Sequence, residues 1–274
     1  MIPYVRAPDL TLIPARFFRG SWPTEDIAVH PFGLLVAIAI WVGIALTFQQ
    51  SRRNRLQTAA VQSYLIWVLV FGFVGGHVFD LLFYYRQYDV SPGAWFRLSE
   101  GQSSFGGFLG AALGSWAWSM RYRTSAWAFA EAVSSSFPSA WFFGRLGCAL
   151  AHDHPGRVSS VWWAVAYPGL PRLDMGLIEA VMTLPLAAAF LWLRKRSRPK
   201  GFFMGVMCVY YAPIRFVLDF ARATDIAGAD ARYARLTPAQ WGCVGLLVVG
   251  TIALAGAYAR AHVKPRHRSS ISVQ

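Results

Sequence analysis

The sequence is poor in charge for its length. Only 14% of its 274 residues are Asp, Glu, Lys or Arg, against about 25% in soluble domains. Cysteine is scarce as well, and Cys148, Cys208 and Cys243 show no C-x-x-C spacing. We expect small buried thiols rather than disulfides. The chain also has no linker long enough to divide it and no repeat of 20–50 residues. These absences exclude a soluble globular domain and a disulfide framework.

What the sequence does contain is long apolar stretches. Hydrophobic residues make up 55% of the chain, including twelve Trp and twenty Phe, and long apolar runs with few charges indicate membrane spans. The sequence therefore predicts an all-α integral membrane protein with seven transmembrane helices. We expect them at about residues 31–49, 58–83, 104–120, 126–150, 174–193, 201–222 and 238–259.

The charge that remains is distributed unevenly between the loops. Residues 52–55, 121–123, 194–200 and the tail from Arg260 hold fourteen Lys and Arg and no acidic residue. Basic loops face the cytoplasm, so the N-terminus is predicted outside and the C-terminus cytoplasmic. The net charge of +13 is then a topology signal and an attraction to anionic headgroups. It does not indicate nucleic acid.

Three segments follow from this pattern. Residues 1–30 are polar and interrupted by Pro, and they read as an extracytoplasmic arm with a short interfacial helix around residues 10–18. Residues 31–260 form the transmembrane domain, and residues 261–274 form a basic cytoplasmic tail. The outer loops are longer than the cytoplasmic ones, so we expect the site at the outer face.

Ionisable side chains inside a bilayer are costly and tend to face a cavity and find partners. In the sixth span Tyr211, Arg215, Asp219 and Arg222 lie at i, i+4, i+8 and i+11, which is one face of a helix. Arg145 in the fourth span is a second permanent cation, and two such arginines suit a lipid phosphate. An Arg215–Asp219 pair that satisfies only itself is the alternative.

A second group of charges lies in GRLGCALAHDHPGR, residues 144–157. Adjacent His152, Asp153 and His154 lack the i, i+4 spacing of a helical ligand pair, so no metal site is expected. Either histidine is a candidate catalytic base. The alternative for His152 is an ordinary interfacial side chain, whereas a turn at Pro155-Gly156 could direct His154 inward.

The order and content of several motifs resemble bacterial prolipoprotein diacylglyceryl transferases. The resemblance covers about residues 28–260, and its most specific part is residues 144–157, whose family form is G-R-x-G-N-F-x-N-x-E-x-x-G. Next in specificity is Y-x-x-x-R-x-x-x-(E/D)-x-x-R in the sixth span. The remaining motifs are HPFGLL (30–35), GGHVFDLLFY (75–84), SSFGGFLG (103–110), DMGLIEA (174–180) and LTPAQW (236–241).

The resemblance implies transfer of the sn-1,2-diacylglyceryl group of phosphatidylglycerol to the lipobox cysteine thiol of a prolipoprotein, with release of glycerol 1-phosphate. Phosphatidylglycerol, prolipoprotein signal peptides and the lipid bilayer are the implied partners. No cofactor is implied, and the location is the bacterial cytoplasmic (inner) membrane with the site towards the outer leaflet. The resemblance makes Arg145 and Arg215 the essential arginines. Phe105 stands where many members have a histidine and cannot accept a proton, so we expect His154 or His152 as the base, or ionisation of the thiol by the charge of the two arginines. The implied substrate-binding residues are Arg145, Tyr211, Asp153, Gly156, Asp219, Arg222, Gly106, Gly107 and His77.

This chain departs from the family at several positions. Phe105 stands where many members have a histidine, Cys148 and Ala151 replace two signature asparagines, and His77 stands where an arginine is common. Two other readings therefore stay open. One is a diverged member that binds phospholipid or lipoprotein precursors without transferring anything. The other is a secondary transporter, which the lack of an inverted repeat disfavours.

Overall fold

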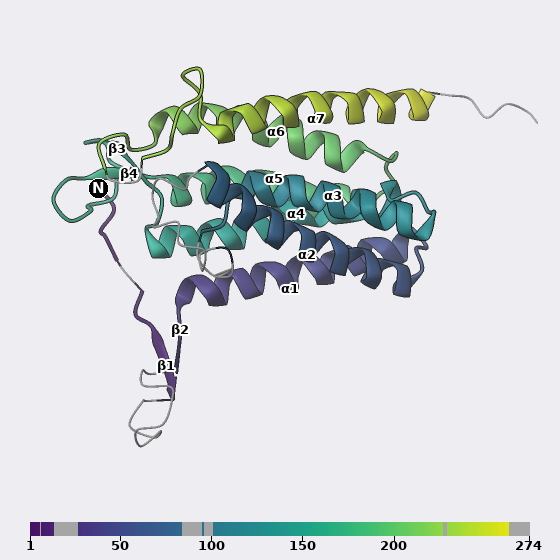
Figure 1. Cartoon of the computed structure of the whole chain (residues 1–274), viewed down its shortest axis with the longest axis horizontal. Helices are drawn as coiled ribbons and strands as arrows, with labels where there is room; N and C mark the ends of the chain where they lie inside the picture. Colours follow the sequence, from purple (N-terminus) through teal and green to yellow (C-terminus); the bar gives the residue numbers. More distant parts are fainter. Residues whose placement is uncertain (6, 14–26, 84–94, 96–100, 227–228, 263–274) are drawn as a thin grey trace, which may run out of the picture.

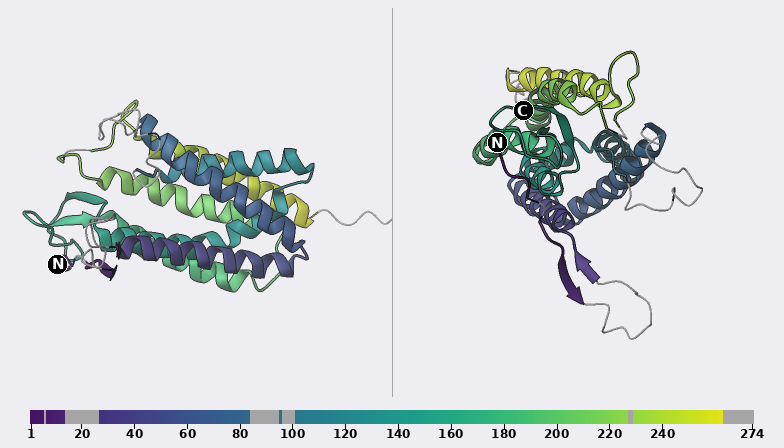
Figure 2. Two further views of the ribbon diagram at one scale, coloured as in Figure 1. Left: turned by 60° about the horizontal axis from the view of Figure 1, so that its bottom comes forward. Right: turned by 90° about the vertical axis from the view of Figure 1, so that its left-hand side faces the viewer.

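The structure is a computed structural model that describes residues 1–5, 7–13, 27–83, 95, 101–226 and 229–262. Within these residues the chain forms a bundle of seven long α-helices that run along one axis (Figure 1). Small β-hairpins lie at one end of the bundle (Figure 1). The end view in Figure 2 shows the helices grouped around the same axis.

The predicted helices agree with the observed ones to within a few residues at most ends. The helices are α1 (Pro31–Arg53), α2 (Thr58–Phe83), α3 (Ser104–Tyr122), α4 (Trp127–Ala151), α5 (Met175–Leu193), α6 (Phe202–Leu218) with the short 3₁₀ turn η4 (Asp219–Ala221), and α7 (Pro238–His262). Five of them, α1, α2, α5, α6 with its 3₁₀ turn, and α7, are long and apolar enough to cross a membrane. The protein is thus a helical membrane protein.

The more polar character of α4 has a structural reason. This helix packs against α1, α5 and α6, so many of its side chains face protein rather than lipid. Ser135 and Ser136 are buried, and Glu131 accepts hydrogen bonds from the backbone N–H groups of Phe203 and Met204 at 2.7 and 3.3 Å. Glu131 therefore caps the N-terminus of α6, where unpaired N–H groups need an acceptor.

Glycines allow α2 and α3 to approach each other closely, because small residues let the backbones of membrane helices come together. Gly106, Gly110 and Gly114 recur every fourth residue on one face of α3. A Cβ at Gly106 would lie 2.4 Å from the carbonyl oxygen of Gly75, and a Cβ at Gly114 would lie 2.7 Å from that of Trp67. Any larger residue would push the two backbones apart.

The basic turns lie together at the end of the bundle away from the hairpins. The Arg53 guanidinium donates to the carbonyl oxygen of Arg194 at 2.9 Å, and Arg260 donates to that of Lys200 at 2.6 Å. Arginines near helix C-termini in this way supply donors to carbonyl oxygens that have no partner within a helix.

The opposite end carries two antiparallel hairpins, β1 (Leu10–Ile13) with β2 (Ile27–Val29), and β3 (Pro155–Val158) with β4 (Arg172–Asp174). The first hairpin projects away from the bundle (Figure 1). The interfacial helix expected around residues 10–18 is wrong for residues 10–13, because pairing with Ile27–Val29 satisfies this backbone as a strand. Residues 14–18 lie outside the described part of the chain.

Candidate active site

Two arginines from different helices meet on one carboxylate inside the bundle. Glu179 of α5 lies 2.9 Å from Nε of Arg145 on α4, through Oε2, and 3.4 Å from Nε of Arg215 on α6, through Oε1. All three side chains are at least 94% buried. Arg145 and Arg215 therefore converge in the structure, and the residue that joins them is Glu179.

A second carboxylate balances the charge of this cluster. Arg215 donates to Oδ1 of Asp219 at 2.5 Å, and the hydroxyl of Thr237 donates to Oδ2 of the same residue. Tyr211 donates to Glu179 at 3.3 Å. Two guanidinium and two carboxylate groups are formally neutral together, which is how buried charges become tolerable. We refer to Arg145, Glu179, Arg215 and Asp219 as the ion cluster.

The ion cluster also contacts an aromatic ring and a thiol. The Arg145 guanidinium carbon lies 4.5 Å from the ring centroid of Trp141, a cation–π distance. Its Nη1 lies 3.9 Å from Sγ of Cys148. Glu179 contacts Arg145 at Nε, whereas Nη1 of Arg145 is directed at Cys148. The paired Nη donors of a guanidinium group bind the oxygens of carboxylates and phosphates.

The prediction that Arg222 shares the helical face of Arg215 is wrong. Helix α6 ends at Leu218, the 3₁₀ turn ends at Ala221, and Arg222 itself is extended. Arg222 still lies 4.0 Å from Asp219, but its closer partner is Asp230 at 2.5 Å. It also pairs through its backbone with Gly156, which ties the residue 144–157 motif to the end of α6.

Gly156 is at a position where no side chain fits. A Cβ there would lie 2.7 Å from the terminal carbon of Met175 and 2.9 Å from the carbonyl oxygen of Ala221.

We expect Gly156→Ala to lower the stability of the protein by about 1–3 kcal/mol, as overpacking does. The matched control is Gly144→Ala, because a Cβ at Gly144 meets nothing within 4 Å. Thermal unfolding in detergent measures both, and equal midpoints for the two variants would contradict the packing account.

His152 lies in a cluster of its own. It is the left-handed C-cap of α4, its Nδ1 lies 2.6 Å from Oδ2 of Asp174, and its ring stacks on Tyr4 at 4.3 Å. Tyr167 donates to the same Asp174 oxygen at 2.9 Å, and burial followed by the Asp174 charge raises the pKa of Tyr167 well above its usual range. Asp174 also caps α5 by accepting from the N–H of Leu177. These contacts fit a structural role for His152.

His154 and Asp153 lie together beyond the end of α4. His154 Nδ1 is 2.9 Å from Oδ1 of Asp153, and their side chains are 29% and 38% exposed. Together with Cys148 they bring three atoms of metal-ligand type within 4.8 Å of one another. Among the histidines of this motif, His154 is the one whose side chain lies on the side of Cys148 and the ion cluster.

The remaining predicted residues lie on α2 and α3. The Nδ1 of buried His77 is 3.4 Å from the carbonyl oxygen of Gly101. The tight contact with Gly75 explains Gly106 by packing alone, and a Cβ at Gly107 would lie 3.7 Å from the carbonyl oxygen of Gly72. A substrate-binding role for these three residues stays a prediction.

Phe105 stands at the position where many members of the family that the sequence resembles have a histidine. The residue is 5% exposed and packs against Ala212, Ala239 and Cys243. A Cβ at Gly242 would lie 2.1 Å from the Phe105 ring, so the glycine on α7 makes room for it. The position is apolar and has no proton acceptor in its side chain.

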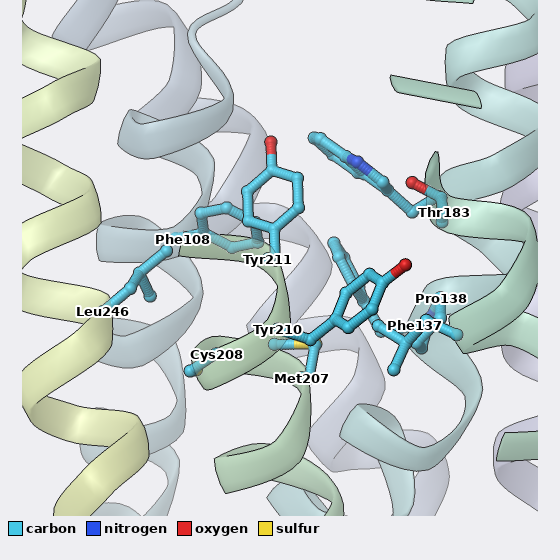
Figure 3. Close-up of a pocket in the computed structure, with 11 residues that line it drawn as sticks. Phe108, Phe137, Pro138, Thr183, Met207, Cys208, Tyr210, Tyr211 and Leu246 are labelled. Atoms are coloured by element: carbon cyan, nitrogen blue, oxygen red, sulfur yellow. The ribbon is translucent and has the colours of Figure 1, made fainter. Parts of the chain in front are cut away.

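An apolar pocket lies next to the ion cluster, on the side away from the β3–β4 hairpin. Tyr211 and Thr183 lie in its wall, and Figure 3 shows their side chains with those of Phe108, Phe137 and Leu246 around it. A smaller pocket between α5 and α6 shares Thr183, Tyr210 and Tyr211 with the first and is lined by Glu179 itself. Apolar pockets therefore adjoin the buried charges.

The sequence analysis assigned no role to Glu179 or Thr237, although the sequence contains a signal for each of them. Two permanent cations in spans require counter-anions, and Glu179 is the single acidic residue of its predicted span after Asp174. Thr237 and Gln240 have the spacing of a capping box. Gln240 accepts from the N–H of Thr237 at 3.0 Å, and Thr237 accepts from the N–H of Gln240 at 3.1 Å.

A bundle of long apolar helices with a buried arginine–carboxylate cluster at one end defines a class: helical membrane proteins with an intramembrane ionic site. The sequence profile described as prolipoprotein diacylglyceryl transferase matches residues 21–255. The chain therefore belongs to the prolipoprotein diacylglyceryl transferase family, and it is a transferase of lipoprotein biosynthesis.

Similar proteins carry the name phosphatidylglycerol–prolipoprotein diacylglyceryl transferase. One from Methylococcus capsulatus is 27% identical over 85% of this chain and 93% of its own. One from Azoarcus sp. is 29% identical over 91% of this chain and 99% of its own. One from Nitratidesulfovibrio vulgaris is 32% identical over 69% of this chain and 74% of its own.

Proposed function

We propose that the protein transfers the sn-1,2-diacylglyceryl group of phosphatidylglycerol to the lipobox cysteine of prolipoproteins and releases glycerol 1-phosphate. The observation that carries this proposal is the meeting of Arg145 and Arg215 around Glu179 in a chain of this family. The names of the relatives state both substrates.

The phosphate is the part of the lipid that the ion cluster suits. Guanidinium forks bind phosphoryl oxygens in pairs. As the carbon–oxygen bond breaks, negative charge grows on the leaving phosphate, and fixed cations in a low-dielectric site stabilise that charge. Arg145 and Arg215 take this role, while Glu179, Asp219 and Tyr211 hold them in position.

The acyl chains need an apolar space beside the headgroup. The pocket of Phe108, Phe137, Leu186 and Leu246 lies next to Tyr211, and the smaller pocket between α5 and α6 reaches Glu179. We propose that the lipid enters sideways between these two helices and brings its phosphate to the arginines, and that the apolar side chains of the pockets move apart to admit its tails.

The sulfur nucleophile must lose its proton, because the thiolate is the reactive form. Phe105 cannot accept that proton. The position of His154 beside Asp153 and Cys148 supports it as the residue that promotes ionisation. His152 is the weaker candidate, since Asp174 and two tyrosines already engage its ring.

We further propose seven crossings, the C-terminus in the cytoplasm, and a site that faces the outer leaflet of the bacterial inner membrane. The clustering of Arg53, Arg194 and Arg260 at one end of the bundle supports this orientation. An alkaline phosphatase that folds only outside the cytoplasm is expected to be inactive when fused after Gln274. A fluorescent protein that folds in the cytoplasm is expected to fluoresce when fused there. Phosphatase activity at that end would contradict the proposed orientation.

The direct test uses purified protein, phosphatidylglycerol vesicles and a lipobox peptide. We expect a diacylglyceryl mass gain on the peptide cysteine and an equal amount of glycerol phosphate. A peptide with Ser in place of that cysteine is the control and should gain nothing. Phosphatidylglycerol that binds without any mass gain would instead support a diverged binder, the reading that Phe105 and Cys148 keep open.

A further inference from the structure

We propose that Cys148, Asp153 and His154 hold a zinc ion beside Arg145, and that its fourth position takes the thiol of the peptide substrate. The inference rests on the proposed function, because it assigns the means by which that thiol ionises. It departs from the metal-free site expected from the sequence and from the family resemblance.

The geometry brings the donors together at the end of α4. Cys148 is on the last turn of the helix, and its thiol is buried. His152 then adopts a left-handed conformation, φ 52° and ψ 34°, which turns the chain sharply. Asp153 and His154 follow this turn, and their ligand atoms lie within 4.8 Å of Cys148 Sγ and of each other. The donor pairs are thus five and six residues apart, a spacing that the adjacent histidines conceal.

The contact between His154 and Asp153 is unusual for a simple pair. Nδ1 of His154 is buried and makes no hydrogen bond, although Oδ1 of Asp153 is 2.9 Å away. A ring nitrogen and a carboxylate oxygen this close together without a hydrogen bond between them suit a shared cation. Tetrahedral zinc with bonds of 2.0–2.3 Å places its ligand atoms roughly 3.3–3.7 Å apart. The site as proposed therefore requires the partly exposed side chains of Asp153 and His154 to move inward when the ion binds.

The charges permit a dication next to an arginine. A Cys148 thiolate and an Asp153 carboxylate carry two negative charges, which cancel those of the metal, and the imidazole of His154 is neutral as a ligand. Arg145 Nη1 at 3.9 Å from Sγ then faces a neutral centre and donates to a coordinated sulfur, as outer partners of metal ligands do. Thiolate with imidazole favours zinc over magnesium or calcium.

A zinc site would ionise the substrate thiol, which the side chain of Phe105 cannot do because it has no proton acceptor. Catalytic zinc has three protein ligands and one open position, and a thiol bound there is deprotonated outright. The proton passes to water on the exposed side of Asp153. The bound sulfur then donates its electron pair to the glycerol carbon of the lipid and forms a carbon–sulfur bond. The carbon–oxygen bond to phosphate breaks, and its electron pair leaves with glycerol 1-phosphate between Arg145 and Arg215.

The test measures metal binding first and activity separately. Full-length protein in detergent is stripped with a chelator and titrated with Zn²⁺, and with Co²⁺ for its thiolate charge-transfer absorption. We expect one ion per chain and a charge-transfer band. Cys148→Ser and His154→Gln should weaken zinc binding by more than the roughly 10–100-fold that loss of an outer partner costs. Cys208→Ser, which removes another buried thiol, is the matched control and should keep both metal and band.

The outcomes separate this inference from the proposed function. Wild type that binds no zinc, or Cys148→Ser that binds it as wild type does, would overturn the site. Stripped protein that transfers diacylglyceryl as fast as loaded protein would overturn its role and leave the transferase intact. Zinc bound at the three residues without any transfer would leave the metal site standing and reject the function.

Discussion

Replacing Arg145 with alanine is expected to lower kcat for diacylglyceryl transfer by about 10²–10³-fold or more, the usual effect of losing one donor that stabilises transition-state charge. Arg145 is expected to show the loss most strongly because its forked edge faces away from Glu179 and towards Cys148. Arg145→Lys is expected to recover little of the rate, since an ammonium cannot grip two phosphoryl oxygens at once.

The same change has a structural side effect that needs its own control. Removing Arg145 leaves buried Glu179 with less positive charge, and breaking a buried ion pair costs about 3–5 kcal/mol. The Arg145→Ala, Glu179→Gln double variant removes one charge of each sign and should unfold at a higher temperature than Arg145→Ala alone. If the double variant regained transfer activity together with stability, Arg145 would be structural and the proposed phosphate site would be wrong.

The second large effect is expected at His154. His154→Gln should cut turnover by about 10²–10⁴-fold, the contribution of a positioned base, while the thermal midpoint changes little because the side chain is partly exposed. A metal held by His154 predicts the same loss of rate, and only metal content and Cys148→Ser distinguish the two. Transfer rates are measured with saturating lipid and peptide, so that the change is in kcat.

Two further histidines serve as comparisons for His154→Gln. His262→Gln at the far end of α7 is expected to retain full activity. His152→Gln is expected to lower stability by about 1–3 kcal/mol, because buried Asp174 loses a hydrogen-bond partner. Unchanged activity in His154→Gln, in His152→Gln and in the double variant would exclude a histidine as the source of ionisation.

Most of the fold was predictable because membrane helices are specified by local sequence. Long apolar runs with few charges placed all seven helices. The short strands were not predictable. Leu10–Ile13 becomes a strand only because Ile27–Val29 lies opposite, and no pattern within residues 10–18 contains that information.

The candidate site was predictable in its residue types and less so in its pairing. The need of Arg145 and Arg215 for counter-anions followed from the cost of charge in lipid, but which acid supplies them depends on how α5 packs against α4 and α6. The prediction for Arg222 was wrong because it applied helical spacing beyond Leu218, the residue at which α6 ends. The bond that Thr237 donates to Asp219 joins residues eighteen apart and follows only from the fold.

The departures from the family also become clearer in three dimensions. Phe105 and Gly242 fit each other as ring and slot, so the apolar residue is accommodated by its surroundings rather than forced among polar groups. Cys148 replaces a signature asparagine but remains in contact with Arg145. A site that has lost a histidine and two asparagines and gained a thiol beside its arginine is consistent with altered means of ionising the substrate.

The most direct test of the central claim follows both products with purified protein, phosphatidylglycerol and a lipobox peptide, in wild type and in the Arg145→Ala, Glu179→Gln variant. In wild type we expect a diacylglyceryl mass gain on the peptide cysteine with one glycerol phosphate per modified peptide. From the folded double variant we expect both products to form at least about 10²-fold more slowly. Equal product from both proteins, or none from wild type that has bound the lipid, would contradict the central claim.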